Sequence, residues 1–342
     1  MAKQRIIGFF CKEDYCVYLR VSRNIYQPSR MNKFYNLDGL PSDEKTDRSI
    51  VVEWNDQFSI IAYDNTSDLD VKLISLTNKV AEELFGSLQI LYNFPLTFAH
   101  TYGGVDAEIK VSKQEFEKWV YSQKSIETHK ILFYYDFQNL VGSLQNLVSE
   151  SRFLFCDFYK TFNVNSFMLS TKPIQPNGLM FASGQIVTNI FSKINHLFIN
   201  LTSQLDFITK ILFEIENLPI DFNEYPKMKS KGILYGDFKK IKSINFENTL
   251  FEKTDEIKLI ISLRNEIIHN ASFENIPKVY QKFEDNILVE KFIYIPDYTN
   301  GLFDTFKNRN RFFNNEVKLN EQLPTLIKDF WIRLENTIDS IK

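Results

Sequence analysis

Apolar residues recur at every third or fourth position over long stretches of the chain, which is the spacing of one face of an α-helix. The clearest stretch covers residues 186–217, and its stripe consists of Ile190, Ile194, Leu197, Leu201, Leu205, Ile208, Leu212 and Ile215. The last stretch, residues 321–341, has the same spacing in Leu323, Leu326, Phe330, Leu334 and Ile338. Both patterns predict amphipathic helices that bury one face against neighbouring elements.

Three further helices are expected between residue 112 and the last stretch. Residues 126–158 present a long apolar face formed by Ile131, Tyr135, Leu140, Leu144, Leu147, Ser151 and Phe155. Ser112 and Glu115 match a capping box, which predicts a short helix from there through Tyr121. A third helix is expected over about 248–270, where it ends before a polar segment that contains proline.

The first hundred residues have a different pattern, in which short runs of aromatic and β-branched residues alternate with polar turns. Such runs favour strands, and we expect them at residues 6–11, 15–21, 50–54, 58–63 and 71–76. Residues 55–57 (Asn-Asp-Gln) separate two of these runs and indicate a hairpin turn. Residues 79–91 predict a helix with one apolar side.

These patterns divide the chain into a mixed α+β region, residues 1–111, and a helical region, residues 112–342. The helical region is expected to be a mainly antiparallel bundle with its core at about 186–342. The prolines and glycines of residues 161–184 indicate a connection within it. A chain of 342 residues is long enough for two such domains.

The composition is that of a folded protein, because 44% of the residues are hydrophobic and 24% are charged. A net charge of −3 gives no global attraction to polyanions, so nucleic-acid binding would need a local patch. The sequence contains no run of 18 uncharged apolar residues, so it predicts no membrane span, and the N-terminus lacks a signal-peptide pattern. The three cysteines form no zinc-like cluster and suggest a reducing compartment. We therefore expect a cytoplasmic protein with no metal, other cofactor or membrane contact.

The segment that carries candidate chemistry lies in the helix expected at about 248–270. On an ideal helix one apolar stripe would contain Ile257, Ile261, Arg264 and Ile268. A guanidinium on such a stripe needs a partner, because an unpaired buried charge is costly. Asn265 and His269 lie one turn apart on the adjoining face. The long side chain of Arg264 can swing toward the face that carries His269.

The sequence Arg264-Asn265-x-x-x-His269 resembles the signature of the HEPN family (higher eukaryotes and prokaryotes nucleotide-binding domain). The resemblance extends over residues 120–342 at most. It implies an antiparallel helical bundle and a metal-independent endoribonuclease with Arg264, Asn265 and His269 as catalytic residues. It also implies a bacterial toxin or antiphage defence effector, with residues 1–111 as a sensor, partner or substrate-positioning element.

HEPN ribonucleases place two copies of the motif across one cleft. Because this chain has one copy, the resemblance implies a homodimer with residues 186–217 and 248–270 near the two-fold axis. The side chains suit RNA cleavage, since His titrates near neutral pH and Arg offers a fork that matches phosphate oxygens. The alternative is a non-catalytic HEPN-like subunit that binds a nucleotide, RNA or protein, such as an antitoxin or partner protein. In it, Arg264 would pair with a carboxylate and His269 would cap the helix.

Basic residues near the motif are candidates for contacts to RNA. They are Lys239, Lys240 and Lys242 of the lysine-rich segment 227–242, and Lys307, Arg309 and Arg311, which alternate with Phe306, Phe312 and Phe313. Cationic side chains and exposed rings together favour single-stranded RNA. His196 precedes the stripe residue Leu197, and we expect it to be satisfied within the bundle. His100 and His129 have no partner at metal-ligand spacing.

Overall fold

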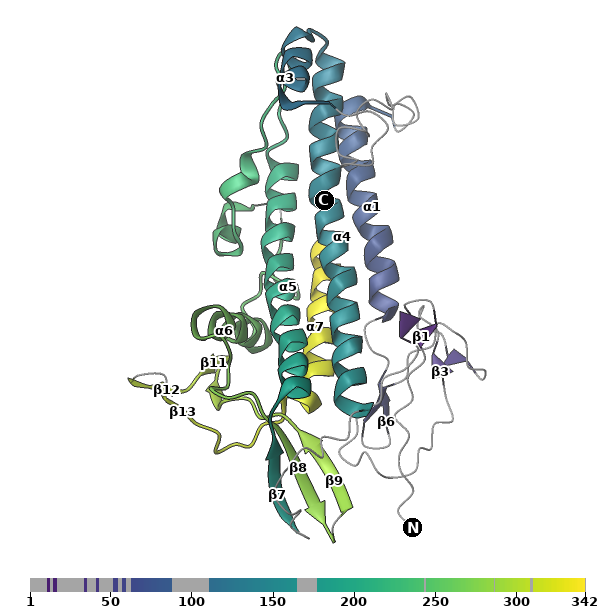
Figure 1. Cartoon of the computed structure of the whole chain (residues 1–342). Coiled ribbons are helices and arrows are strands. Elements are labelled where there is room, and N and C mark those ends of the chain that lie inside the picture. The colour runs from purple at the N-terminus through teal and green to yellow at the C-terminus, as the bar shows by residue number, and fades with distance from the viewer. Residues whose placement is uncertain are drawn as a thin grey trace. The chain divides into compact units, whose positions relative to one another are not determined.

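The computed structural model describes residues 63–87, 111–164, 177–242, 244–285, 287–307 and 310–341, and short strands within the first 59 residues (Figure 1). The helices are α1 (Tyr63–Phe85), α3 (Lys113–Ser122), α4 (Ile126–Val164), α5 (Gln185–Glu216), α6 (Asp255–Asn270) and α7 (Leu319–Asp339), with two short 3-10 helices, η3 (Lys229–Gly232) and η4 (Tyr235–Lys240). The strands are β1 (Cys11–Lys12), β2 (Tyr15–Cys16), β3 (Phe34–Tyr35), β4 (Pro41–Ser42), β5 (Val52–Trp54), β6 (Gln57–Ser59), β7 (Gly178–Ala182), β8 (Val279–Glu284), β9 (Ile287–Phe292), β10 (Tyr298–Thr299), β11 (Leu302–Phe303), β12 (Thr305–Phe306) and β13 (Asn310–Arg311). The described part is thus mainly helical with small antiparallel sheets, which agrees with the predicted α+β class.

Contacts between residues group the chain into two compact units. The first unit consists of Met1–Leu69, Leu147–Gln204 and Asn245–Thr337, and the second of Asp70–Asn146, Leu205–Ile244 and Ile338–Lys342. Four of the five divisions fall inside helices, and the fifth, between Ile244 and Asn245, falls in a loop. The sequence pattern instead indicates a boundary after residue 111. Helix α4 has 39 residues and is therefore about 58 Å long, which exceeds the diameter of one small domain.

The two clearest helix predictions are confirmed. Helices α5 and α7 match the predicted ranges to within two residues at each end. Their predicted stripes are buried, except that Ile215 is half-buried. The helix predicted over 126–158 is also found, as α4, and the capping box begins α3, where the Ser112 hydroxyl accepts the N–H of Glu115 at 3.2 Å.

Helix α7 is fixed at its N-terminal end by two contacts. Pro324 has no N–H, so the carbonyl of Asn320 lacks its donor within the helix. The Tyr159 hydroxyl of α4 donates to that carbonyl at 2.6 Å. The Asn320 side chain accepts the backbone N–H of Ile293 at 3.0 Å. One turn of α7 therefore binds both α4 and the segment after β9 in the first unit (Figure 1).

The three-stranded sheet β7-β8-β9 does not appear in the sequence prediction. Strand β8 lies in the middle, and Met180 of β7 faces Gln281 of β8 in the register. Val279, Gln281 and Phe283 are buried, and this alternation is typical of a strand with one covered face. Residues 161–184, expected to be a connection, thus contain the end of α4 and strand β7.

Among the predictions for the first 91 residues, one hairpin is confirmed and one strand is wrong. Strands β5 and β6 pair with Trp54 opposite Gln57, which confirms the predicted turn. The strand predicted at 71–76 is wrong, because α1 covers these residues. The buried side chains there recur at helical spacing: Leu69, Leu73, Leu76, Val80 and Leu84. The helix predicted over 79–91 begins earlier, and residues 88–91 lie outside the described ranges.

Candidate functional site

The motif lies on α6, in the first unit. The helix begins at Asp255, later than predicted, and the Thr254 hydroxyl accepts the N–H of Ile257 at 3.4 Å as its N-terminal cap. It ends at Asn270, and the next residue, Ala271, has a left-handed φ of 67°. His269 therefore belongs to the last turn, where the helix dipole favours a positive charge.

The buried face of α6 is turned by one residue from the predicted stripe. The buried residues are Ile257, Leu259, Ile260, Leu263 and Ile267. The stripe expected through Ile261, Arg264 and Ile268 is therefore wrong, and Ile268 is 49% exposed. One residue corresponds to a rotation of about 100°, which moves Arg264 out of the core to a half-buried position. Its guanidinium consequently needs no buried carboxylate.

The three motif side chains lie outside the buried face of α6. Arg264 donates from Nη1 to Oδ1 of Asn265 at 3.1 Å. Asn265 and His269 are both exposed and lie one helical turn apart. The hydrogen bond thus holds the guanidinium toward the face that carries the imidazole. Among the described residues, no carboxylate forms an ion pair with Arg264.

A buried arginine fixes the C-terminal end of the motif helix. Arg311 of β13 forms an ion pair with Glu266 of α6 and donates to the carbonyl of Ser272 at 3.1 Å. The Arg311 side chain is only 5% exposed. Asn270 donates from Nδ2 to the same Glu266 carboxylate at 2.6 Å. These contacts flank His269 in the sequence and hold the turn on which it lies.

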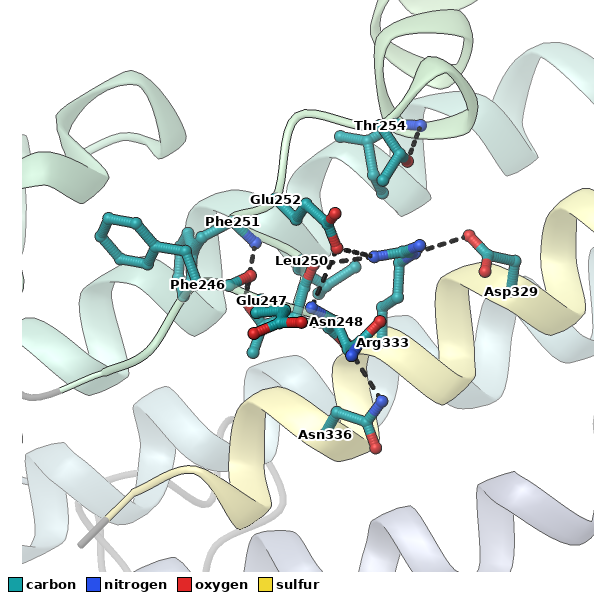
Figure 2. A network of polar contacts seen from close by, with 12 residues as sticks. Phe246, Glu247, Asn248, Leu250, Phe251, Glu252, Thr254, Asp329, Arg333 and Asn336 are labelled. Carbon is teal, nitrogen blue, oxygen red and sulfur yellow. Dashed lines mark hydrogen bonds and ion pairs between the residues drawn. The ribbon is translucent and has the colours of Figure 1, made fainter.

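A second arginine holds the loop that leads into α6, as Figure 2 shows. Arg333 of α7 donates to Glu252 and to Asp329, each at 2.8 Å, and its side chain is 15% exposed. The hydrogen bond from the guanidinium holds the pKa of the Glu252 carboxyl below its ordinary value. Asn336 donates to the carbonyl of Asn248 at 3.0 Å. The loop is therefore anchored to α7 by both side chains and backbone.

Gly301, in the turn between β10 and β11, lies directly against α6. Its φ is 75°, and a Cβ at this position would lie 2.3 Å from the carbonyl oxygen of Asp255. The Ser262 hydroxyl donates to the Gly301 carbonyl at 2.9 Å. Only glycine permits this approach without displacing the helix.

The candidate RNA-binding residues have different environments. Lys307 is exposed in the first unit, while Arg309 lies outside the described residues. Arg311 is buried in the ion pair with Glu266, so it does not present its charge to solvent. The exposed side chains of Lys239, Lys240 and Lys242 belong to the second unit, where Lys240 pairs with Asp237 at 2.8 Å. The motif and these three lysines are thus not in the same compact unit.

A groove of about 450 Å³ lies beside the end of α6. It is lined by Asn195 and His196 of α5 and by Ala271 and Ser272, which follow the motif helix. His196 is 48% exposed and its Nε2 lies 3.3 Å from Oε1 of Glu150 on α4, so it has a partner on a neighbouring helix, as the sequence predicts. Its position next to the stripe residue Leu197 is the signal that could have placed it at the edge of the buried face.

In the part of the chain that the structure describes, no three His, Cys, Asp or Glu side chains are grouped so that they could hold a metal ion. None of the helices in the described ranges is long and apolar enough to cross a membrane. Comparison with protein-family models, with curated proteins and with solved structures finds no match to this chain. The geometry of the motif and of the groove is therefore the basis for the functional argument.

Proposed function

We propose that this chain is a metal-independent endoribonuclease of HEPN type that acts as a homodimer. The observation that carries the proposal is the position of the motif side chains outside the buried face of α6. Arg264 pairs with the amide of Asn265, and His269 lies one turn further along. The buried face of α6 consists of Ile257, Leu259, Ile260, Leu263 and Ile267, so the three motif residues are not needed to pack this helix.

The side chains have complementary roles in the cleavage. His269 takes the proton from the 2′-hydroxyl of the RNA, since imidazole accepts protons near neutral pH. Arg264 donates to the phosphate oxygens as negative charge builds on them. Asn265 holds the guanidinium in place through its side-chain oxygen. The contacts that Arg311 and Arg333 make hold helix α6, which carries the three motif residues, in one position.

A single motif offers one histidine, so a second copy of the chain completes the cleft in this proposal. The exposed apolar side chains of Ile268 and Ile276, 49% and 60% exposed, provide contacts for that copy next to the motif. In this proposal the helical part of the chain is a HEPN-like antiparallel bundle. The biological setting is a bacterial toxin or an antiphage defence effector in the cytoplasm, regulated by the N-terminal region or by a partner protein.

The proposal is tested with the full-length protein and a single-stranded RNA of mixed sequence in buffer containing EDTA. Cleavage is expected, with 2′,3′-cyclic phosphate ends, because the 2′-oxygen is the nucleophile. The Arg264→Ala variant should lose the activity and keep its circular dichroism spectrum. RNA that stays intact with the wild-type protein, but binds to it, would favour the non-catalytic subunit instead.

A further inference from the structure

A separate cavity of about 460 Å³ lies in the second compact unit. Its walls are one face of α3, the start of α4 and the loop that follows α5. A volume of this size is typical of sites that hold small molecules. Every residue that lines it belongs to the second unit, whereas the motif lies in the first.

The loop that forms one wall is fixed to α4 by two hydrogen bonds. Nδ1 of His129 on α4 donates to the carbonyl of Phe222 at 2.9 Å. The hydroxyl of Tyr225 donates to the carboxylate of Asp136 on the same helix. Glu224 lies between these two attachment points in the loop and lines the cavity. The wall therefore has its shape before any ligand binds, which reduces the entropic cost of binding.

His129 presents a hydrogen-bond acceptor at the inner end of the cavity. The residue is only 3% exposed and lines the cavity. Because its Nδ1 donates to the Phe222 carbonyl, the neutral ring has its proton there, and Nε2 is an acceptor. Nε2 has no partner among the described residues and keeps accessible surface, unlike the enclosed Oε2 of Glu214 in the same unit. A nearly buried acceptor of this kind suits a donor on a ligand.

The charged groups of the cavity are all negative among its described lining residues. Glu117 of α3 and Glu224 of the loop line it, and no lysine or arginine does. Glu224 forms no ion pair with any described residue. Glu117 lies 3.6 Å from Lys113, but this lysine side chain is 86% exposed, and such pairs contribute little free energy. The cavity thus has an unbalanced negative charge.

Aromatic rings provide the third feature of the cavity. Tyr121 lies one helical turn beyond Glu117 on α3, lines the cavity and is 83% exposed. Tyr225, from the loop, also lines it and is half-buried. The faces of aromatic rings attract cations. The carboxylates, the rings and the imidazole acceptor therefore all favour a positively charged group that carries N–H donors.

We propose that this cavity binds a small organic ammonium ion. The ammonium group donates to the carboxylates and to Nε2 of His129, and the apolar body of the ligand lies against the rings of Tyr121 and Tyr225. The inference is independent of the proposed ribonuclease, because the motif belongs to the other unit. A free amine and a lysine side chain carry the same ammonium group, and the experiment below separates these two sources.

The test measures binding of four probes to the full-length protein by ligand-detected NMR titration at about pH 8, where a primary amine is charged. Phenethylammonium is expected to bind saturably below about 10 mM. Phenethyltrimethylammonium keeps the charge but has no N–H, and phenethyl alcohol has no charge, so each should bind about tenfold more weakly. Nα-acetyl-lysine methylamide represents a peptide, and tighter binding of this probe than of phenethylammonium would identify a lysine side chain as the ligand.

Three variants test the groups that the proposal uses. Glu224→Gln should raise the Kd of phenethylammonium about five- to tenfold, and Tyr121→Leu about threefold. His129→Asn keeps a donor near the position of Nδ1 but lacks the Nε2 acceptor. It should reduce the preference for phenethylammonium over its trimethyl analogue to about twofold or less. Glu83→Gln, at an exposed site on α1 in the same unit, is the matched control and should bind as wild type does.

The outcomes that would overturn the proposal are distinct from those of the cleavage assay. The ammonium site is refuted if phenethylammonium shows no saturable binding, or if phenethyl alcohol binds equally well. It is also refuted if Glu224→Gln and Tyr121→Leu both bind phenethylammonium as wild type does. These two variants change exposed side chains, so they decide the matter even if His129→Asn fails to fold. Loss of RNA cleavage in the motif variants leaves this site unaffected.

Discussion

Replacing Arg311 by methionine tests whether the motif helix is held by a buried charge. The Arg311 side chain is 5% exposed and its partner Glu266 is 18% exposed, so the substitution leaves a largely enclosed carboxylate without its cation. Breaking a buried ion pair on one side costs about 3–5 kcal/mol. Since Glu266 keeps its hydrogen bond from Asn270, we expect a loss of about 3 kcal/mol, the lower end of this range.

The assay is equilibrium unfolding in urea, followed by circular dichroism. Lys307→Met is the matched control, because Lys307 is an exposed basic residue on the same hairpin, and its effect should stay within about 0.5 kcal/mol. Adding Glu266→Gln to Arg311→Met removes the stranded charge and should recover about 1–2 kcal/mol. If Arg311→Met is as mild as Lys307→Met, or if the double variant is less stable than Arg311→Met, the reasoning is refuted.

Three further predictions concern stability and assembly. Burial lowers the pKa of Lys291, whose Nζ donates to the carbonyl of Phe162 at 2.6 Å, from 10.5 to about 7. The unfolded chain then binds more protons between these values, so the unfolding free energy should rise as pH increases from about 7 to about 10. Lys291→Met should weaken this dependence, and an unchanged pH profile in urea unfolding would contradict the assignment. Gly301→Ala should cost about 1–3 kcal/mol from backbone strain alone, and wild-type stability in the same assay would show that the turn does not press on α6. Light scattering at micromolar concentration should give twice the chain mass of 40.4 kDa, and a strict monomer would count against the dimeric cleft.

Helices α5 and α7 could be predicted because each has one apolar face that is buried along its length. Leu197 and Leu201 on α5 and Leu323 and Phe330 on α7 are all fully buried, as the sequence pattern indicates. Local spacing was sufficient there, since the core lies on one side of each helix. The start of α6 was predicted too early, because the preceding loop is shaped by its contacts to Arg333, which is about 80 residues away in the sequence.

The sheet was missed because its strands are short and depend on distant partners. Strand β7 pairs with β8, so that Ala182 faces Val279 across almost a hundred residues of sequence. The alternation of Val279, Gln281 and Phe283 was present and could have indicated a strand. Nothing within β7 itself specifies that pairing, since Ala182 is its one buried residue.

The candidate site could be predicted only in part. The spacing of Arg264, Asn265 and His269 identified the motif, but the orientation of the helix was off by one residue. The contact of His196 with Glu150 joins two helices, and no local pattern relates residues that are 46 positions apart. The alternation of basic and aromatic residues suggested that Arg311 contacts RNA, whereas the structure uses it to pair with an acid on α6.

The most direct test of the central claim is the cleavage rate of His269→Ala on single-stranded RNA in EDTA. The account predicts a fall in kcat/KM of about 10²–10⁴-fold, with unfolding in urea unchanged, because the imidazole is exposed and takes no part in packing. Glu256→Gln, at an exposed site in the first turn of the same helix, should cleave at the wild-type rate. Cleavage by His269→Ala at the wild-type rate would contradict the account and place the chemistry elsewhere.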